Sequence, residues 1–346
     1  MATPNVRPRI ALALQGGGAH GAYGWGVVER LLEEGVDLVG VSGASAGAMN
    51  GAAIVSGYAA NGCEGARDTM ERLWRTVANA SPLAPLDFGH WGGPFFEPWL
   101  RRSLDIANLS SRYVAPFLPS VRDMRALRRA VQDSIDLDLL RHQTRVPLHV
   151  AATHIATGSP HLFTGEAVTL DALMASACLP DLFSAVEIGG EYYWDGGFTA
   201  NPALEPLLTD AVGATDMIIV QITPFTVDDL GSGVSDVMRR VSDISFNACL
   251  RRDLRALSEI QDIARAEHSS DPRMQAIARV NLHLLSPPPE LAGRFSISKV
   301  DTRWSVLQDL RAMGRDQAEK WLATNRRFIG HDSSFEGLVE EAMTGD

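Results

Sequence analysis

Two glycine-rich segments, each between a strand-like and a helix-like run, constrain this fold most strongly. The first, LALQGGGAHG at residues 12–21, follows the apolar run RIALALQ and precedes GAYGWGVVERLLEEG, whose apolar residues recur at helical spacing. The second, VGVSGASAG at residues 39–47, joins the run VDLVGVSG to the small-residue run ASAGAMNGAAIVSG. This strand–helix–strand–helix order predicts an α/β fold, in which helices flank a mainly parallel central sheet.

The rest of the chain extends this pattern and then changes character near residue 225. Sequence periodicity predicts helices at residues 120–141 and 169–180, and strands at residues 146–158, 159–165, 216–224 and, as a pair joined at Gly189 and Gly190, within 185–197. Beyond residue 225 the pattern is mostly helical, with one strand-like run at residues 279–285. We therefore expect an α/β domain at residues 8–224. A mostly helical C-terminal extension at residues 225–346 is expected to cover the sheet or to form a subunit contact in a homo-oligomer.

Charge and cysteine content limit the partners and the compartment. The formal net charge of −11 argues against a nucleic-acid partner and against electrostatic docking on anionic lipid. Apolar contact with a membrane or a lipid inclusion stays open. The three cysteines, Cys63, Cys178 and Cys249, are odd in number and far apart, which favours a reducing cytoplasm. The apolar runs are too short for a transmembrane helix, and the first of them reads as a strand rather than a signal peptide.

The pattern GASAG places Ser45 at the centre of a G-x-S-x-G motif, on a predicted strand-to-helix turn. Gly43 and Gly47 permit a sharp turn that exposes the serine hydroxyl, and the helix that begins near Ala46 offers free N–H groups to a developing oxyanion. A glycine-rich chain produces this pattern by chance as well, so the string alone is weak. Its position after a buried strand favours Ser45 as a nucleophile.

The run GGGAHG has two readings. Gly16, Gly18 and Gly21 match the G-x-G-x-x-G fingerprint of dinucleotide-binding loops. That reading needs an acidic residue at the end of the second strand, where this chain has VSGAS, so a nucleotide-binding protein is the less favoured alternative. Consecutive glycines also expose N–H groups in a concave nest that suits a negative oxygen.

A serine nucleophile needs a base, and the sequence offers two kinds of candidate. His268, His283 and His331 lie late in the chain, but none has an informative setting. In YYWDGG, Asp195 follows an aromatic run, and Gly196 and Gly197 let backbone and substrate approach it. Burial raises the pKa of a carboxylate and makes it a better base. The same Asp-Gly-Gly sequence is also a common turn.

Four blocks together resemble the patatin-like phospholipase family. They occur in the family's order at residues 13–35, 41–50, 175–183 and 188–208. The resemblance implies a three-layer α/β fold and a serine acyl hydrolase that cleaves carboxylic esters of lipids without a metal or organic cofactor. The scattered histidines show no metal-ligand spacing either. A non-catalytic lipid-binding protein of the same fold is a further alternative.

Residue by residue, the resemblance assigns Ser45 as the nucleophile and Asp195 as its base, with Gly16, Gly17 and Gly18 as the oxyanion hole. The substrate is then a lipid or another acyl ester, such as a phospholipid, a lysophospholipid, an acylglycerol or a polyester. The sequence does not specify which.

One position departs from the family and one segment is ambiguous. His20 stands where the family usually has Lys or Arg, so it either supplies a positive charge when protonated or merely packs the loop. Trp91, Phe95, Phe96 and Trp99 lie in the irregular stretch at residues 81–120. They are expected to pack on the sheet, to line an acyl channel or to form a lid.

Overall fold

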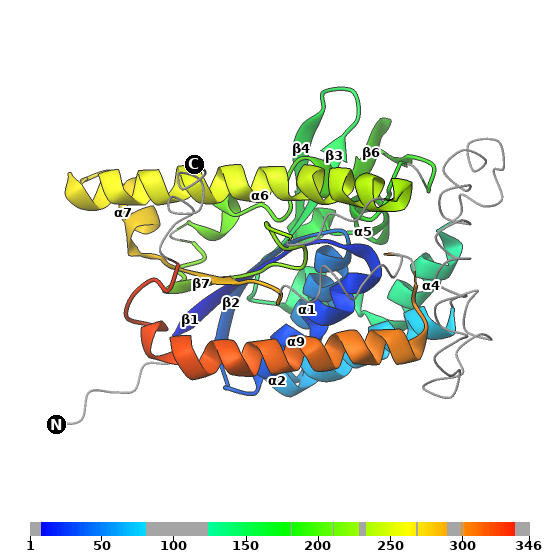
Figure 1. Ribbon diagram of the computed structural model, residues 1–346, viewed down its shortest axis with the longest axis horizontal. Helices are drawn as coiled ribbons and strands as arrows, with labels where there is room; N and C mark the ends of the chain where they lie inside the picture. The colour runs from blue at the N-terminus through cyan, green and yellow to red at the C-terminus, as the bar shows by residue number, and fades with distance from the viewer. Residues whose placement is uncertain are drawn as a thin grey trace.

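An eight-stranded mixed sheet lies at the centre of the molecule (Figure 1). The computed structural model describes residues 8–80, 124–180, 182–209, 211–227, 233–267, 269–288, 299 and 301–335. The strands are β1 (Arg9–Leu14), β2 (Asp37–Ala44), β3 (Leu148–His154), β4 (Ser159–Thr164), β5 (Val186–Ile188), β6 (Glu191–Asp195), β7 (Asp216–Val220) and β8 (Asn281–Leu285). Their order is β5-β6-β3-β2-β1-β7-β8, with β4 paired to β3.

The sheet is mainly parallel, as the sequence predicts. Strands β3, β2, β1, β7 and β8 run parallel to one another, whereas β4, β5 and β6 run antiparallel to their partners. The parallel strands therefore end at one edge of the sheet, where ligands bind in open α/β sheets. The predicted α/β class is confirmed. Strand β8, however, belongs to the C-terminal part, so the sheet extends across the expected boundary at residue 224 and the two-domain division stays a prediction.

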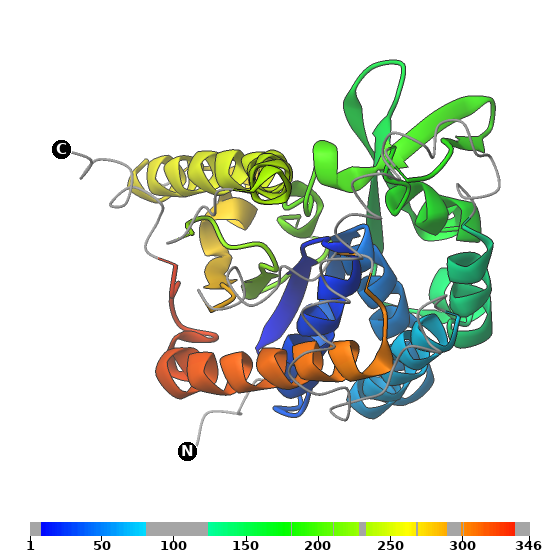
Figure 2. The same cartoon turned by 45° about the vertical axis from the view of Figure 1, so that its right-hand side comes forward.

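Helices cover both faces of the sheet (Figures 1 and 2). The longer helices are α1 (Gly21–Leu32), α2 (Ala46–Asn79), α4 (Arg125–Ser134), α5 (Leu170–Ser176), α6 (Val234–Ala266), α7 (Pro272–Arg279) and α9 (Trp304–Asn325). Side chains of β1 alternate between the two faces. Ile10, Leu12 and Leu14 join the core with α1, α2 and α9, whereas Ala11 and Ala13 join the core with α6. This period of two produces the three layers.

The expected helix at residues 120–141 is wrong as a single element. The structure has α4, then a break, then the π-helical turn η6 (Leu139–Gln143). Ile135 is extended and buried, and the Asp136 carboxylate accepts the N–H groups of Asp138 and Leu139 at 3.0 Å. A side chain that satisfies those donors starts a new turn and ends the previous one. Residues 81–120, which include Trp91, Phe95, Phe96 and Trp99, lie outside the described residues.

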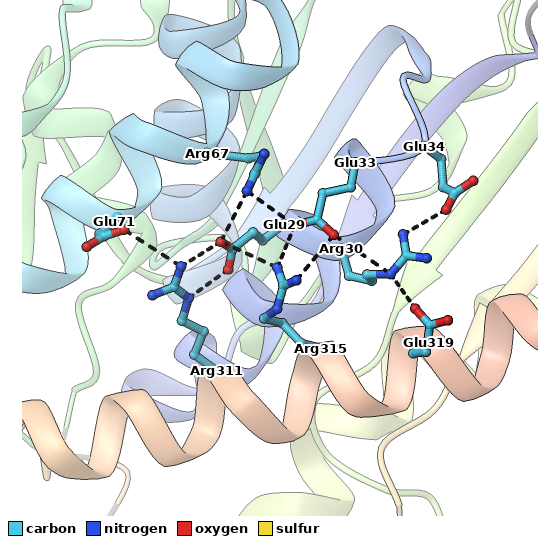
Figure 3. Close-up of polar contacts among 9 residues, drawn as sticks. All are labelled: Glu29, Arg30, Glu33, Glu34, Arg67, Glu71, Arg311, Arg315 and Glu319. Carbon is cyan, nitrogen blue, oxygen red and sulfur yellow. Dashed lines mark hydrogen bonds and ion pairs between the residues drawn. The ribbon is translucent and has the colours of Figure 1, made fainter.

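An ion-pair network joins α9 to α1 and α2 (Figure 3). The side chain of Glu29, on α1, is only 5% exposed. Its two carboxylate oxygens accept hydrogen bonds from two nitrogens of the Arg311 guanidinium, at 2.7 and 2.5 Å. Arg315 and Arg67 also reach Glu29. The helix of the C-terminal part is therefore attached to the first helix of the chain by charge as well as by apolar packing. Throughout the described ranges, helices are too short or too polar to cross a membrane.

Candidate active site

Ser45 lies at a sharp turn between β2 and α2. Its backbone, at φ 53° and ψ −125°, makes it the sole residue other than glycine with a positive φ in the described chain. Such strain persists where the surrounding structure enforces it. A Cβ on Gly47 would collide with the Leu14 carbonyl, and a Cβ on Gly43 would press on Gly47. These two glycines therefore let α2 begin directly against the sheet, with Ser45 just before its first turn.

The strand register brings Asp195 to the same level as Ser45. Ala44 of β2 pairs with Ala151 of β3, and the next residue, Ala152, pairs with Asp195 of β6. Asp195 is the last residue of β6 and caps the short turn η8 (Gly196–Phe198), where its Oδ1 accepts the Gly197 N–H at 2.7 Å. Residues 150 positions apart in the sequence thus meet across one strand.

The carboxylate of Asp195 is completely buried. Burial raises its pKa to about 6, although the Ser45 side chain, the Gly197 N–H and the positive charge of Lys299 all lower that pKa. Oδ2 receives no hydrogen bond of full geometry from the described residues, although the Ser45 side chain is near enough to lower the pKa of the carboxyl. Active-site hydrogen bonds are often loose before a substrate tightens them. A carboxyl of this kind is ionised at neutral pH and basic enough to accept a proton.

The glycine loop lies against the Ser45 turn. The Gly16 N–H already donates to Asn201 Oδ1 at 2.7 Å, so it is occupied in this state. The N–H groups of Gly17 and Gly18 have no acceptor within the described ranges. Ala46 opens α2, whose first N–H groups have no partner inside the helix. Gly17, Gly18 and Ala46 therefore offer the donors that could face an oxyanion, and Gly16 fixes the loop.

His20 ends the short turn η1 (Gly18–His20) and precedes α1. Its side chain is buried, with 9% exposed, and it is not among the residues that line the cavity beside Ser45. Its expected role as a positive charge stays a prediction.

Three further residues hold this site in place, and none of them was predicted from the sequence. Ser176 Oγ accepts the Ser45 N–H at 2.9 Å and donates to the Ala151 carbonyl at 2.6 Å. Asn201 holds Gly16, and its amide also donates to the Phe246 carbonyl at 3.1 Å. Ser176 and Asn201 lie inside the blocks that carry the family resemblance, which was the available signal. Lys299 lies outside them, and no sequence motif points to it.

An apolar cavity of about 240 Å³ opens beside Ser45. Its walls come from α2, α4 and the segment after α5, and include Leu73, Trp74, Val77, Leu127, Leu179 and Phe183. Lys299 is the one charged residue among the described residues that line it. The cavity can hold a hydrocarbon chain whose end reaches the serine hydroxyl.

The histidine candidates for the base do not meet Ser45 in the described chain. His283 lies on β8, where Nε2 contacts Asp216 Oδ1 at 3.0 Å and Nδ1 contacts Ser334 Oγ at 2.9 Å. Asp216 starts β7, at the edge of the sheet opposite to Ser45, and this contact helps to lower the Asp216 pKa. His331 is exposed near the end of the described chain, and His268 lies outside the described residues.

The described part of the chain contains no cluster of three or more His, Cys, Asp or Glu side chains that could hold a metal ion. The expectation that no metal or cofactor is needed stays a prediction.

Comparisons with known proteins place these features in context. A family model described as patatin-like phospholipase matches residues 12–208, more than half of the chain. Uncharacterised NTE family proteins of Mycobacterium bovis and Mycobacterium tuberculosis are 29% identical over 203 residues, which cover 58% of this chain and 44% of theirs. The match thus spans less than half the length of those relatives. The crystal structure of VipD from Legionella pneumophila aligns with a TM-score of 0.41 and 16% identity, over 92% of this chain and 67% of that one.

Proposed function

The chain belongs to the patatin-like phospholipase family, and on that basis we propose that it is a serine acyl hydrolase acting on lipid esters through a Ser45–Asp195 dyad. One observation carries the proposal. A fully buried carboxylate with its pKa raised to about 6 interacts with a serine hydroxyl held on a strained strand-to-helix turn. Perturbed carboxylates of this kind occur at catalytic sites.

The proposed reaction follows acyl transfer in two steps. Asp195 takes the proton of Ser45 as Oγ attacks the ester carbonyl, and the N–H groups of Gly17 and Gly18 stabilise the resulting oxyanion. The proton then passes to the departing alcohol as the tetrahedral intermediate collapses to an acyl-enzyme. Asp195 next activates a water molecule, which releases the acid and restores Ser45.

The cavity supports a substrate with an apolar acyl chain. Burial of one CH₂ group contributes about 0.8 kcal/mol, so kcat/KM should rise about fourfold per methylene until the cavity is full. Lipids with such chains occur in membranes or aggregates, and contact with a lipid surface is part of the same proposal. The three cysteines form no disulfide with one another in the described part of the chain, which fits a reducing cytoplasm, the compartment that we propose.

Hydrolysis of p-nitrophenyl esters with acyl chains of increasing length tests this function. We expect turnover by the wild type, none by Ser45→Ala or Asp195→Asn, and a preference for shorter chains after Val77→Phe, because Val77 lines the cavity. A nucleotide-binding protein would instead retain a nucleotide, whatever residue stands at position 45. A non-catalytic lipid-binding protein would bind the chains without turnover, and either result would overturn the proposal.

A further inference from the structure

We propose that Lys299, which lies beyond the segment that matches the family model, is a positioning residue of the active site: its carbonyl fixes the glycine loop, and its ammonium places a positive charge at the edge of the site where it acts on Asp195. The inference rests on the proposed function, because it assigns Lys299 a role in positioning the proposed Ser45–Asp195 dyad. The family model ends at residue 208, 91 positions before Lys299.

The backbone of Lys299 is bonded to the glycine loop. The Ala19 N–H donates to the Lys299 carbonyl at 2.7 Å. A Cβ on Gly18 would collide with that same carbonyl oxygen, and Gly18 also has a positive φ of 60°. The loop and residue 299 therefore fit one another only with glycine at position 18. This contact holds in place the residues whose N–H groups would face the oxyanion.

The side chain of Lys299 is held by α6. Nζ lies 3.0 Å from Asp243 Oδ1 and 5.3 Å from the centre of the Phe246 ring. Phe246 in turn packs so tightly on Gly197 that a Cβ there would collide with the ring. Gly197 is the residue that donates to Asp195. Asp243 and Phe246 thus hold the ammonium at the edge of the site, where its positive charge lowers the pKa of Asp195.

This placement resolves a conflict in the chemistry of a buried base. A buried carboxylate without a cation is driven to its neutral form, which cannot accept a proton. A direct ion pair would lower the pKa far enough to make the carboxylate a poor base. A lysine whose charge is shared with Asp243 lies between these limits.

Among the residues that the structure describes, few charged groups lie around Lys299. Helix α6 contributes Asp243, β6 contributes Asp195, and η1, which packs against Lys299, carries His20. Asp301 and Arg303, the next charged residues along the chain, form a buried ion pair with each other at 2.8 Å. Of the described groups, Asp243 is the one that makes an ion pair with Lys299.

The test compares the pH dependence of kcat/KM for a soluble ester in Lys299→Met, Lys299→Arg and Asp243→Asn. In Lys299→Met we expect the apparent pKa of the acid limb of the kcat/KM profile to rise by about one pH unit, which is about a tenfold loss of kcat/KM at pH 5. In Lys299→Arg we expect that pKa to stay in place. Asp243→Asn should move it down, because the ammonium is then no longer neutralised. Lys320→Met, an exposed lysine on α9 paired with Asp316, is the matched control and should change nothing.

A purely structural role for Lys299 would lower kcat without moving the limb. An unchanged limb in Lys299→Met, or shifts of the same sign in Lys299→Met and Asp243→Asn, overturns the inference. If Lys299→Met does not fold, the downward shift of Asp243→Asn decides it. These results stand apart from a failure of the proposed function, in which the wild type itself would not depend on Ser45.

Discussion

The raised pKa of Asp195 suits its proposed role as a base, but the burial that causes it costs stability. Its pKa is raised from 3.8 to about 6 by burial, so the carboxyl must lose its proton before it can act as a base. We expect kcat/KM to fall as the pH drops through about 6, with a slope of one proton. A pH–rate profile that stays flat down to pH 4.5 would contradict this role for Asp195.

The same shift predicts how stability depends on pH. A carboxyl with a higher pKa in the folded than in the unfolded chain stabilises the fold below its unfolded pKa, and that contribution is lost as the pH rises through about 6. Asp195→Asn should therefore exceed the wild type in stability at pH 8, by up to about 3 kcal/mol, and the difference should shrink at pH 4.5. Thermal unfolding of both proteins at the two pH values measures it. Equal melting temperatures at pH 8 would argue against a buried, ionised carboxylate.

Ser176 is predicted to act on catalysis through the position of Ser45. Ser176→Ala leaves the Ser45 N–H without its acceptor, and we expect kcat/KM to fall about tenfold with the fold retained. Ser56→Ala is the matched control, because Ser56 Oγ bonds to the Asp136 backbone elsewhere in the fold. Equal activity in the two variants would remove Ser176 from the site.

Among the elements, α1 and α9 are joined by the network around Glu29. Glu29→Gln removes the buried carboxylate that Arg311 and Arg315 share, although Glu71 and Glu33 stay as their outer partners, and we expect a loss of about 2 kcal/mol in the free energy of unfolding. Asp316→Asn removes the exposed pair with Lys320 on the same helix and should cost less than about 1 kcal/mol. Chemical denaturation compares them, and a small effect of Glu29→Gln would make the network incidental.

Local patterns predicted most of the elements, because strand alternation, helical spacing and glycine turns act over a few residues. The strand that precedes Ser45 and the strand that ends at Asp195 were predicted in this way. The break after α4 was not, because it depends on the Asp136 side chain reaching two N–H groups. Asn201 and Lys299 were missed for a different reason. Their contacts with Gly16 and Ala19 span 185 residues or more, and no local pattern encodes such contacts.

At the scale of the whole molecule, the part beyond residue 224 is integral to the site and to the sheet. It supplies β8, which pairs with β7, and Asn247, whose Oδ1 accepts a hydrogen bond from the Gln15 amide at 2.9 Å just before the glycine loop. We expect a fragment of residues 8–224 to be inactive and prone to aggregation, since both faces of its sheet would lose covering helices. Gel filtration and ester hydrolysis test this, and an active monomeric fragment would contradict it.

The most direct measurement is the mass of the intact protein after reaction with a fluorophosphonate, followed by peptide mapping. The Ser45–Asp195 dyad predicts one adduct on Ser45 in the wild type, none in Ser45→Ala, and strongly slowed labelling in Asp195→Asn. An adduct on another residue, or full-rate labelling of Asp195→Asn, would contradict the dyad.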